Sequence, residues 1–474
     1  MDRAPPLPHD LHATYSRQRA ACLAEPYPEW ATRRDRLRRL LELLLEQQQR
    51  ICEAVRADFG QRARAETEVL DLVPSLASLR HALRHGRAWM RPRRARPSIW
   101  FRPASAQVLP QPLGVVGIIA PWNYPLYLSV APLASALAAG NRAMLKLSES
   151  APNFGSLLTE LVAARFDADE LAVFTGDARQ AAAMTTLPLD HLLFTGSTAV
   201  GRQVMAAAGP RLVPVTLELG GKSPAVVAPG YDLRLAAQRI VYGKLVNAGQ
   251  TCVAPDHVHV PRAQLQDFAA ACVQAARAMY PEGLRGADFC SVVDRRQYER
   301  LLGMLEQARA AGVPMVPLFA GPQRLDDAHR LAPVLLLDPP ATLRVMQEEI
   351  FGPLLPLLGY EQPARLLQHI AEQPRPLALY WFDDDPARVD HMLRNTHSGG
   401  VTINDTLMHV AQEELPFGGL GASGMGHYHG SWGFDTFSKL KPVLRQRRLS
   451  GAALLRPPYR PAVVRLIEWM KRWA

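Results

Sequence analysis

Apolar runs alternate with amphipathic segments along most of this chain, and the alternation predicts an α/β fold. Residues 33–85 are rich in Arg, Leu, Glu and Ala at helical spacing, and one apolar face is marked by Leu40, Leu43, Leu44 and Leu45. The pattern changes at Gly114, where residues 114–119 form a continuous apolar run. Such a run is typical of a parallel strand that is buried on both faces.

Strands and helices then alternate in two blocks. The expected strands are residues 114–119, 143–147, 171–174, 191–195, 225–227 and 257–260. The expected helices are residues 126–139, 153–165, a segment from about 199, residues 233–245 and a segment from 263. Alternation at this spacing implies right-handed crossovers and a parallel sheet. The block before Gly220 is predicted to be a Rossmann-like domain, and the block after it a second α/β unit.

Two segments fall outside this alternation. The stretch from about Arg91 to Pro112 is basic and punctuated by prolines, which excludes a long helix and predicts an extended arm or hairpin. The tail from Ala462 to Ala474 predicts a short amphipathic helix with a basic polar side. Such a helix suits either a membrane surface or a partner subunit, and we favour the partner subunit.

Composition narrows the class of protein. The 474 residues are 48% hydrophobic and 21% charged, as in ordinary globular enzymes. The five cysteines are scattered without a CxxC pair, so we expect no disulfide framework, no metal site and a cytoplasmic, reducing location. No apolar run suits a secretory signal or a membrane span. The net charge of +10 includes an arginine cluster at residues 91–96, interpreted as a solvated linker because no nucleic-acid-binding module accompanies it.

The strongest chemical signal is Cys252, which follows a Gly249-Gln250 loop. Upstream, Glu218 directly precedes a loop that contains two consecutive glycines. A lone cysteine is usually a small buried hydrophobe. Together with a carboxylate beside a glycine loop, however, the thiol can act as a covalent nucleophile and the carboxylate as its general base.

Asn123 is the candidate for stabilising negative charge on a reacting oxygen. It lies between Pro121 and Pro125, which fix a loop directly after a predicted strand. Its amide could donate to a developing oxyanion together with the backbone N–H of Cys252. A turn-forming asparagine is the alternative, but the position at a strand end favours a function.

Two further strand ends predict a nucleotide site. Gly196 and Ser197 lie at a strand-to-helix turn, where free N–H groups and the helix dipole suit a pyrophosphate. Lys146 and Glu149 follow an earlier strand and suit the hydroxyls of an adenine ribose. A packing turn and a surface ion pair are the structural alternatives. The coincidence of both features at strand ends favours nucleotide binding.

Together these strings resemble the aldehyde dehydrogenase family from about Gly114 to Lys439. The resemblance implies a Rossmann-like cofactor domain, an α/β catalytic domain and a β-hairpin oligomerisation arm. It implies oxidation of an aldehyde to the acid through a thiohemiacetal and a thioester on Cys252, with NAD, or alternatively NADP, as cofactor. Glu149 favours NAD because a carboxylate repels a 2′-phosphate, and Leu147 stands where the family usually has proline. The implied cofactor-binding residues are Trp122, Lys146, Glu149, Gly196, Ser197, Gly201, Glu349 and Phe351.

Several strings point to one branch of the family. Residues 250–256 and 404–410 resemble the class-3-type enzymes, and residues 424–430 are most similar to bacterial coniferyl-aldehyde dehydrogenases. We therefore expect coniferyl aldehyde or another aromatic aldehyde as substrate, although the lining suits a fatty or medium-chain aldehyde equally. The expected pocket residues are Tyr124, Leu128, His409 and Phe417. A coenzyme A-acylating enzyme is disfavoured by Glu218, and a non-catalytic binding protein by the presence of all three catalytic candidates.

The resemblance also divides the chain. It implies an NAD(P)-binding domain from residues 1–90 and 115–218, a catalytic domain from 219–415, oligomerisation segments at 91–114 and 416–450, and a tail at 451–474. A symmetric homodimer is the simplest closed assembly. The expected partners are thus a small aldehyde and a second copy of the chain, without nucleic acid or membrane.

Overall fold

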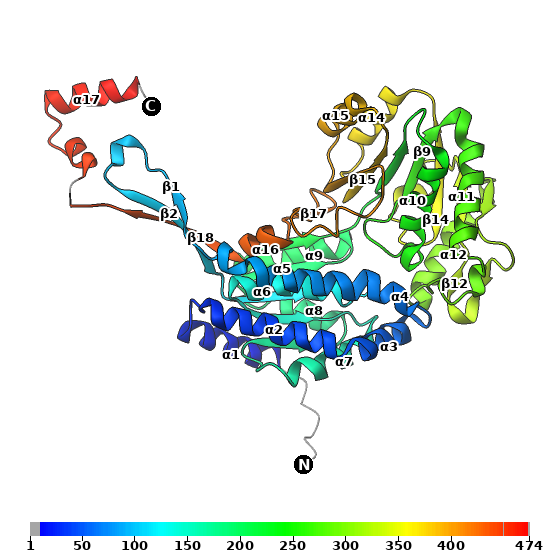
Figure 1. The fold of residues 1–474 in the computed structure, drawn as a ribbon, viewed down its shortest axis with the longest axis horizontal. Helices are drawn as coiled ribbons and strands as arrows, with labels where there is room; N and C mark the ends of the chain where they lie inside the picture. Colours follow the sequence, from blue (N-terminus) through cyan, green and yellow to red (C-terminus); the bar gives the residue numbers. More distant parts are fainter. Residues whose placement is uncertain (1–9, 449, 473–474) are drawn as a thin grey trace, which may run out of the picture.

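Two large sheets and two small ones form the framework of the computed structural model, which describes residues 10–448 and 450–472 (Figure 1). The strands and helices expected between Gly114 and Ala276 begin within two residues of their predicted positions. Nothing in the described part of the chain forms a helix both long and apolar enough to cross a membrane.

The first sheet has six strands in the order β17-β7-β6-β3-β4-β5. Only β17 runs antiparallel to its neighbour. Every residue of β3, β4, β5 and β6 is buried, which explains the consecutive apolar residues at their centres. The strands are β3 (Val115–Ile119), β4 (Arg142–Lys146), β5 (Leu171–Phe174), β6 (His191–Thr195), β7 (Val215–Glu218) and β17 (Gly424–Met425).

Helices cover this sheet, and several begin or end at recognisable residues. Ser197 caps α9 through its hydroxyl, and Gly140 ends α6 with a left-handed φ of 94°. Helices α2 and α5 pack beside α6 (Figure 1). The helices of this half are α1 (Leu11–Ala24), α2 (Trp30–Glu46), α3 (Gln48–Phe59), α4 (Arg64–Thr67), α5 (Val73–Trp89), α6 (Tyr127–Ala139), α7 (Pro152–Ala163), α8 (Ala178–Thr185) and α9 (Thr198–Ala208).

The second sheet has seven strands in the order β10-β13-β14-β9-β8-β15-β16, and only β10 is antiparallel to its neighbour. Its strands are β8 (Pro224–Val227), β9 (His257–Pro261), β10 (Met315–Pro317), β13 (Val334–Leu337), β14 (Leu354–Tyr360), β15 (Ala378–Phe382) and β16 (Gly400–Ile403). Its helices are α10 (Leu233–Leu245), α11 (Leu265–Met279), α12 (Arg295–Ala310), α13 (Arg344–Gln347), α14 (Pro363–Glu372) and α15 (Pro386–Asn395). A small hairpin, β11 (Arg324–Leu325) with β12 (Arg330–Leu331), lies apart from it.

The third sheet forms an arm that projects from the body (Figure 1). It contains β1 (Arg93–Ala95), β2 (Ser105–Pro112) and β18 (Ser438–Arg445), all antiparallel. The tail helix α17 (Pro461–Lys471) returns to this arm, where the rings of Trp100 and Trp469 meet edge to face at 5.4 Å. Residues 416–437 lie instead on the body, because β17 pairs with β7 and α16 (Gly430–Thr436) packs on α5 and α6.

Candidate active site

The nucleophile loop, residues 246–252, follows α10 along a strained path. Asn247 and Ala248 both have a left-handed φ of 51°. Gly249 has a φ of 77°, and a Cβ atom there would lie 2.3 Å from the carbonyl oxygen of Gly352. Because L-residues rarely adopt this conformation, the surrounding structure must hold the loop in place.

Hydrogen bonds to residues from distant segments fix this loop. The Glu66 carboxylate accepts from the backbone N–H of Asn247 at 2.6 Å. The Gln250 amide donates to the carbonyl oxygens of Asn247 at 2.9 Å and Ser291 at 3.0 Å. Its own oxygen accepts from the backbone N–H of Val293 at 2.9 Å. A buried polar network with its partners in place rigidifies the loop that presents the cysteine.

A buried ion pair supports the neighbouring Asn123 loop. Arg62 and Asp71 are both fully buried and approach to 3.0 Å. Nη1 of Arg62 donates to the carbonyl oxygen of Asn123 at 3.2 Å, and Asp71 accepts from the backbone N–H of Tyr127 at 3.0 Å. One pair of charges therefore fixes both the Asn123 loop and the start of α6.

Asn123 lies directly beside the nucleophile loop. Its side chain is buried, and Nδ2 donates to the carbonyl oxygen of Gln250 at 3.0 Å. Its main-chain carbonyl accepts from Nδ2 of Asn247 at 3.0 Å. A side-chain amide carries two N–H donors, so Asn123 retains a second one for a substrate oxygen.

Glu218 ends β7 as a buried carboxylate, with 2% of its surface exposed. Among the described residues, neither of its oxygens has a hydrogen-bond partner. Burial raises the pKa of Glu218 well above its usual range. A carboxylate with a raised pKa and free oxygens is suited to take a proton from a thiol or from water.

The charges of two carboxylates affect the pKa of the Cys252 thiol. Burial raises its pKa to about 12, and the charges of Glu349 and Glu218 add to the rise. The backbone N–H groups of Cys252 and Val253 oppose it, because they stabilise the thiolate. The thiol is therefore protonated at neutral pH, and a nearby base must remove its proton before the sulfur can attack.

A cavity of about 210 Å³ reaches Cys252. Three of the four predicted pocket residues, Tyr124, Leu128 and Phe417, line it. The fourth, His409, is not among its lining residues, because Nδ1 of His409 pairs with the Thr402 hydroxyl at 2.8 Å. The other lining residues include Val69, Leu70, Tyr127, Tyr242, Leu407, Met408 and Val410. This mostly apolar lining suits a substrate with a hydrophobic body.

A second cavity, of about 440 Å³, lies at the carboxyl ends of β3, β4 and β6. The lining includes five of the predicted cofactor residues: Trp122, Lys146, Glu149, Gly196 and Ser197. A Cβ atom at Gly196 would lie 2.5 Å from the ring of Phe194, so a larger residue would require that ring to move. The turn leads into α9, whose first N–H groups are available to a phosphate. A dinucleotide fits this cradle.

The other three predicted cofactor residues lie outside that cavity. Gly201 lets α9 pack closely on Leu219, because a Cβ atom there would lie 2.6 Å from Cδ2 of the leucine. Glu349 lines a cavity of about 540 Å³, where burial raises its pKa to about 8. Its Oε1 has no hydrogen-bond partner in the described chain, which suits a ribose hydroxyl. Phe351 meets Trp122 edge to face at 5.4 Å.

Sequence reasoning missed the groups that support the site. Arg62, Glu66 and Asp71 lie in a helical stretch rich in arginine and glutamate, where their pattern matches that of surface charges. One signal was available, because Asp71 interrupts the apolar run Val69-Leu70-Leu72-Val73. A charge inside an apolar run is a candidate for a buried pair.

Comparisons with known proteins agree with this geometry. The model of the aldehyde dehydrogenase family matches residues 17–443. The chain is 48% identical to a probable coniferyl aldehyde dehydrogenase of Pseudomonas aeruginosa, over 97% of this chain and 96% of that protein. It is 42% identical to a coniferyl aldehyde dehydrogenase of a Pseudomonas species, over 99% and 98% of the two chains. The substrate-bound structure of Staphylococcus aureus AldH covers 98% of this chain and 99% of its own, with a TM-score of 0.92 and 34% identity.

These matches confirm both the family resemblance and the α/β fold class that the sequence predicts. The chain therefore belongs to the aldehyde dehydrogenase family and is an NAD(P)-dependent oxidoreductase that acts on the aldehyde group.

Proposed function

We propose that this chain oxidises coniferyl aldehyde, or a closely related aromatic aldehyde, to the carboxylic acid with NAD as cofactor. The observation that carries this proposal is the set of aromatic rings around the cavity at Cys252: Tyr124, Tyr127, Tyr242 and Phe417. Aromatic side chains favour a planar aromatic ligand through stacking and edge-to-face contacts. The names of two relatives, both for coniferyl aldehyde, support the same class of substrate.

The catalytic roles follow from the contacts of three residues. Glu218 takes the proton of the Cys252 thiol, directly or through one water, and the sulfur forms a bond to the aldehyde carbon. The free N–H of Asn123 and the backbone N–H of Cys252 donate to the oxyanion of this thiohemiacetal. NAD, which Lys146, Glu149 and Gly196 would hold, would supply the hydride acceptor for oxidation of the thiohemiacetal to a thioester. After Glu218 has released its first proton to solvent, it takes a proton from water, whose oxygen attacks the thioester. The carbon–sulfur bond then breaks, which releases the acid and leaves Cys252 as a thiolate that regains its proton.

The cofactor preference rests on Lys146 and Glu149. Nζ of Lys146 donates to the carbonyl oxygens of Leu147 at 2.6 Å and Gly176 at 2.8 Å, which leaves its third N–H for a ribose hydroxyl. Glu149 is exposed at the same edge of the cavity. Its negative charge opposes a 2′-phosphate, which supports NAD over NADP.

Measuring NADH formation without coenzyme A tests the proposal. We expect the wild-type enzyme to oxidise coniferyl aldehyde with a higher kcat/KM than benzaldehyde or hexanal. Turnover should disappear in Cys252→Ala and persist in Cys22→Ala, a matched control at a half-buried cysteine that lines neither cavity. A preference for hexanal would contradict the aromatic substrate. Equal activity in both cysteine variants would contradict the role of Cys252.

A fatty or medium-chain aldehyde is the second candidate, because Val69, Leu70, Leu128 and Leu407 add aliphatic surface to the same cavity. The variant Tyr242→Leu separates the two. Loss of one aromatic contact, worth about 0.5–1.5 kcal/mol, should lower kcat/KM about two- to tenfold for coniferyl aldehyde and leave hexanal unchanged. An equal effect on both aldehydes would favour the aliphatic candidate.

We further propose that the enzyme is a cytoplasmic homodimer joined through the arm. Its free cysteines support a reducing compartment. Exposed Ile99, Phe101, Leu440 and Leu444 on the arm support a covered apolar face. Sedimentation velocity should show a dimer for the wild-type protein and a monomer for Leu440→Arg/Leu444→Arg. A wild-type monomer would contradict the assembly.

A further inference from the structure

Helix α5 carries two histidines outside the catalytic cavities. His81 and His85 are four residues apart, so their side chains project from the same face of the helix. The centroids of their rings are 4.5 Å apart. Neither residue lines the substrate cavity or the cofactor cavity. Two imidazoles at this helical spacing can bind one metal ion.

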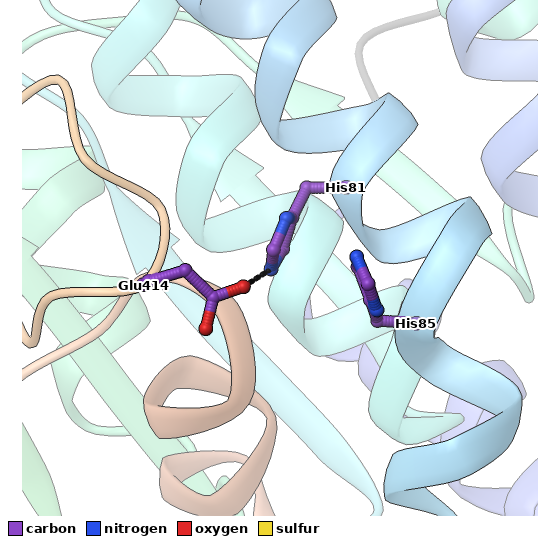
Figure 2. Close-up of side chains that lie close together, drawn as sticks. All are labelled: His81, His85 and Glu414. Carbon is purple, nitrogen blue, oxygen red and sulfur yellow. Dashed lines mark ion pairs between the residues drawn. The ribbon is translucent and has the colours of Figure 1, made fainter.

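A carboxylate from a distant part of the chain faces this pair. Glu414, in the segment between β16 and β17, places Oε1 3.3 Å from Nε2 of His81 (Figure 2). One ligand atom from each of the three side chains lies within 4.8 Å of the other two. In a tetrahedral zinc site, bonds of about 2.0–2.1 Å separate neighbouring ligand atoms by about 3.3 Å. The His81–Glu414 distance already has this value, and one nitrogen of His85 lies within 4.8 Å of both other ligand atoms.

Neighbouring residues hold two of these ligands in place. The carboxylate of Glu413 accepts a hydrogen bond from the hydroxyl of Ser78, which lies one turn before His81 on α5. This bond ties the segment that carries Glu414 to the histidine helix. At the other end, Trp89 stacks on His85 with an interplanar angle of 22° and 6.1 Å between ring centroids. Contacts that orient ligands in advance increase metal affinity.

We propose that His81, His85 and Glu414 form a binding site for a divalent transition metal ion, with Zn²⁺ as the best match. Two imidazole nitrogens and one carboxylate oxygen suit zinc, with water as a fourth ligand. Calcium and magnesium prefer all-oxygen sites, so the two histidines disfavour them. The sequence-based expectation of no metal site rested on the absence of paired cysteines. It did not consider pairs of histidines at helical spacing.

The bound ion joins two walls of the substrate cavity. Helix α5 begins at Val73, and Pro74 in its first turn lines that cavity. The segment that carries Glu414 also contributes Val410 and Phe417 to the lining. Because the ion bonds to both elements, it restricts the movement of one wall relative to the other.

Calorimetric titration of the full chain with Zn²⁺ tests the site. Every sample carries Cys252→Ala, because the catalytic thiol itself can bind zinc. We expect one tight equivalent with the triad intact. His85→Ala and Glu414→Gln should each weaken binding by at least about tenfold, the smallest loss typical of removing even an outer-shell partner. Arg84→Gln is the matched control, because it changes an exposed residue between the histidines and should retain the affinity.

Two results overturn the proposal. One is the same binding, or none, in the intact triad and both ligand variants. The other is a loss in Arg84→Gln as large as that in His85→Ala, since damage to the helix would then explain both. Thermal melting and NAD binding verify that each variant is folded. Independently, Zn²⁺ should slow amide hydrogen exchange in residues 406–416 of the intact triad and not in Glu414→Gln, and unchanged exchange in both overturns the link between the walls.

Discussion

The candidate reaction centre and the ion pair that supports it each contain a buried carboxylate, and the two carboxylates differ in their partners. Neither oxygen of Glu218 has a hydrogen-bond partner in the described chain. Asp71, equally buried, is paired with Arg62 at 3.0 Å and accepts from the backbone N–H of Tyr127. Burial raises the pKa of both carboxyls, but at Asp71 the charge of Arg62 opposes the rise. The comparison indicates that the proposed proton acceptor has no hydrogen-bond partners, whereas the group that fixes a loop has several.

Removing the unpartnered carboxylate should produce the largest effect. Glu218→Gln keeps the size of the side chain but cannot accept a proton. We expect steady-state kcat to fall by about 10²–10⁴-fold, the usual contribution of a positioned general base. Stopped-flow measurement of NADH locates the loss, since slow hydrolysis of the thioester leaves a burst of about one equivalent. An unchanged kcat would show that Glu218 is not the general base, and the comparison with Asp71 would then lose its meaning.

Breaking the paired charges should instead affect stability. Arg62→Met leaves Asp71 buried without its partner, which should lower the free energy of unfolding by about 3–5 kcal/mol. The double variant Arg62→Met/Asp71→Leu removes both charges and should recover most of that loss. Urea titration of the wild-type protein, both single variants and the double variant measures the coupling. Purely additive losses would mean that the two charges do not act as a pair.

Asn123, the proposed hydrogen-bond donor to the substrate oxygen, allows a further test of the comparison. Asn123→Ala removes the N–H that is free for the substrate oxygen, so we expect kcat to fall by about 10²–10³-fold. The same change also removes the bond to Gln250. Gln250→Ala serves as the control, because it disturbs the nucleophile loop and leaves the donor in place. If both variants lose kcat and stability equally, Asn123 acts only by fixing the loop.

The sequence marks the candidate catalytic residues more clearly than the residues that support them, and the reason is physical. Cys252 and Asn123 lie on turns marked by glycine or proline, and Glu218 ends the strand before such a turn, a local signal that needs no knowledge of the fold. Continuous apolar runs likewise predicted strands such as β3, because burial on both faces leaves no polar alternation. The contact between Arg62 and Asp71, and their reach to Asn123, depends on tertiary structure that joins distant segments.

The direction in which a side chain points could not be predicted from the sequence either. His409 was predicted to line the pocket, and its neighbours Met408 and Val410 do line the cavity. The histidine itself turns to Thr402 on the adjacent strand β16. Sequence spacing places a residue near a site, but its rotamer is chosen by packing and hydrogen bonding.

The smallest expected effect is that of Glu218→Gln on stability, and it has the opposite sign to that of Arg62→Met. The raised pKa of Glu218 means that the folded protein binds its proton more tightly than the unfolded chain does. Below the unfolded pKa of about 4.3, both states are protonated, so Glu218→Gln and the wild-type protein should be similarly stable. As pH rises from the unfolded pKa to the folded pKa, the unfolded chain releases this proton while the folded protein keeps it, so the stability of the wild-type protein falls. Glu218→Gln should therefore become the more stable protein, by about 1 kcal/mol, in melting experiments from pH 5 to pH 9. A difference that does not change with pH would show that Glu218 acquires a partner for its charge, and the contrast with Asp71 would fail.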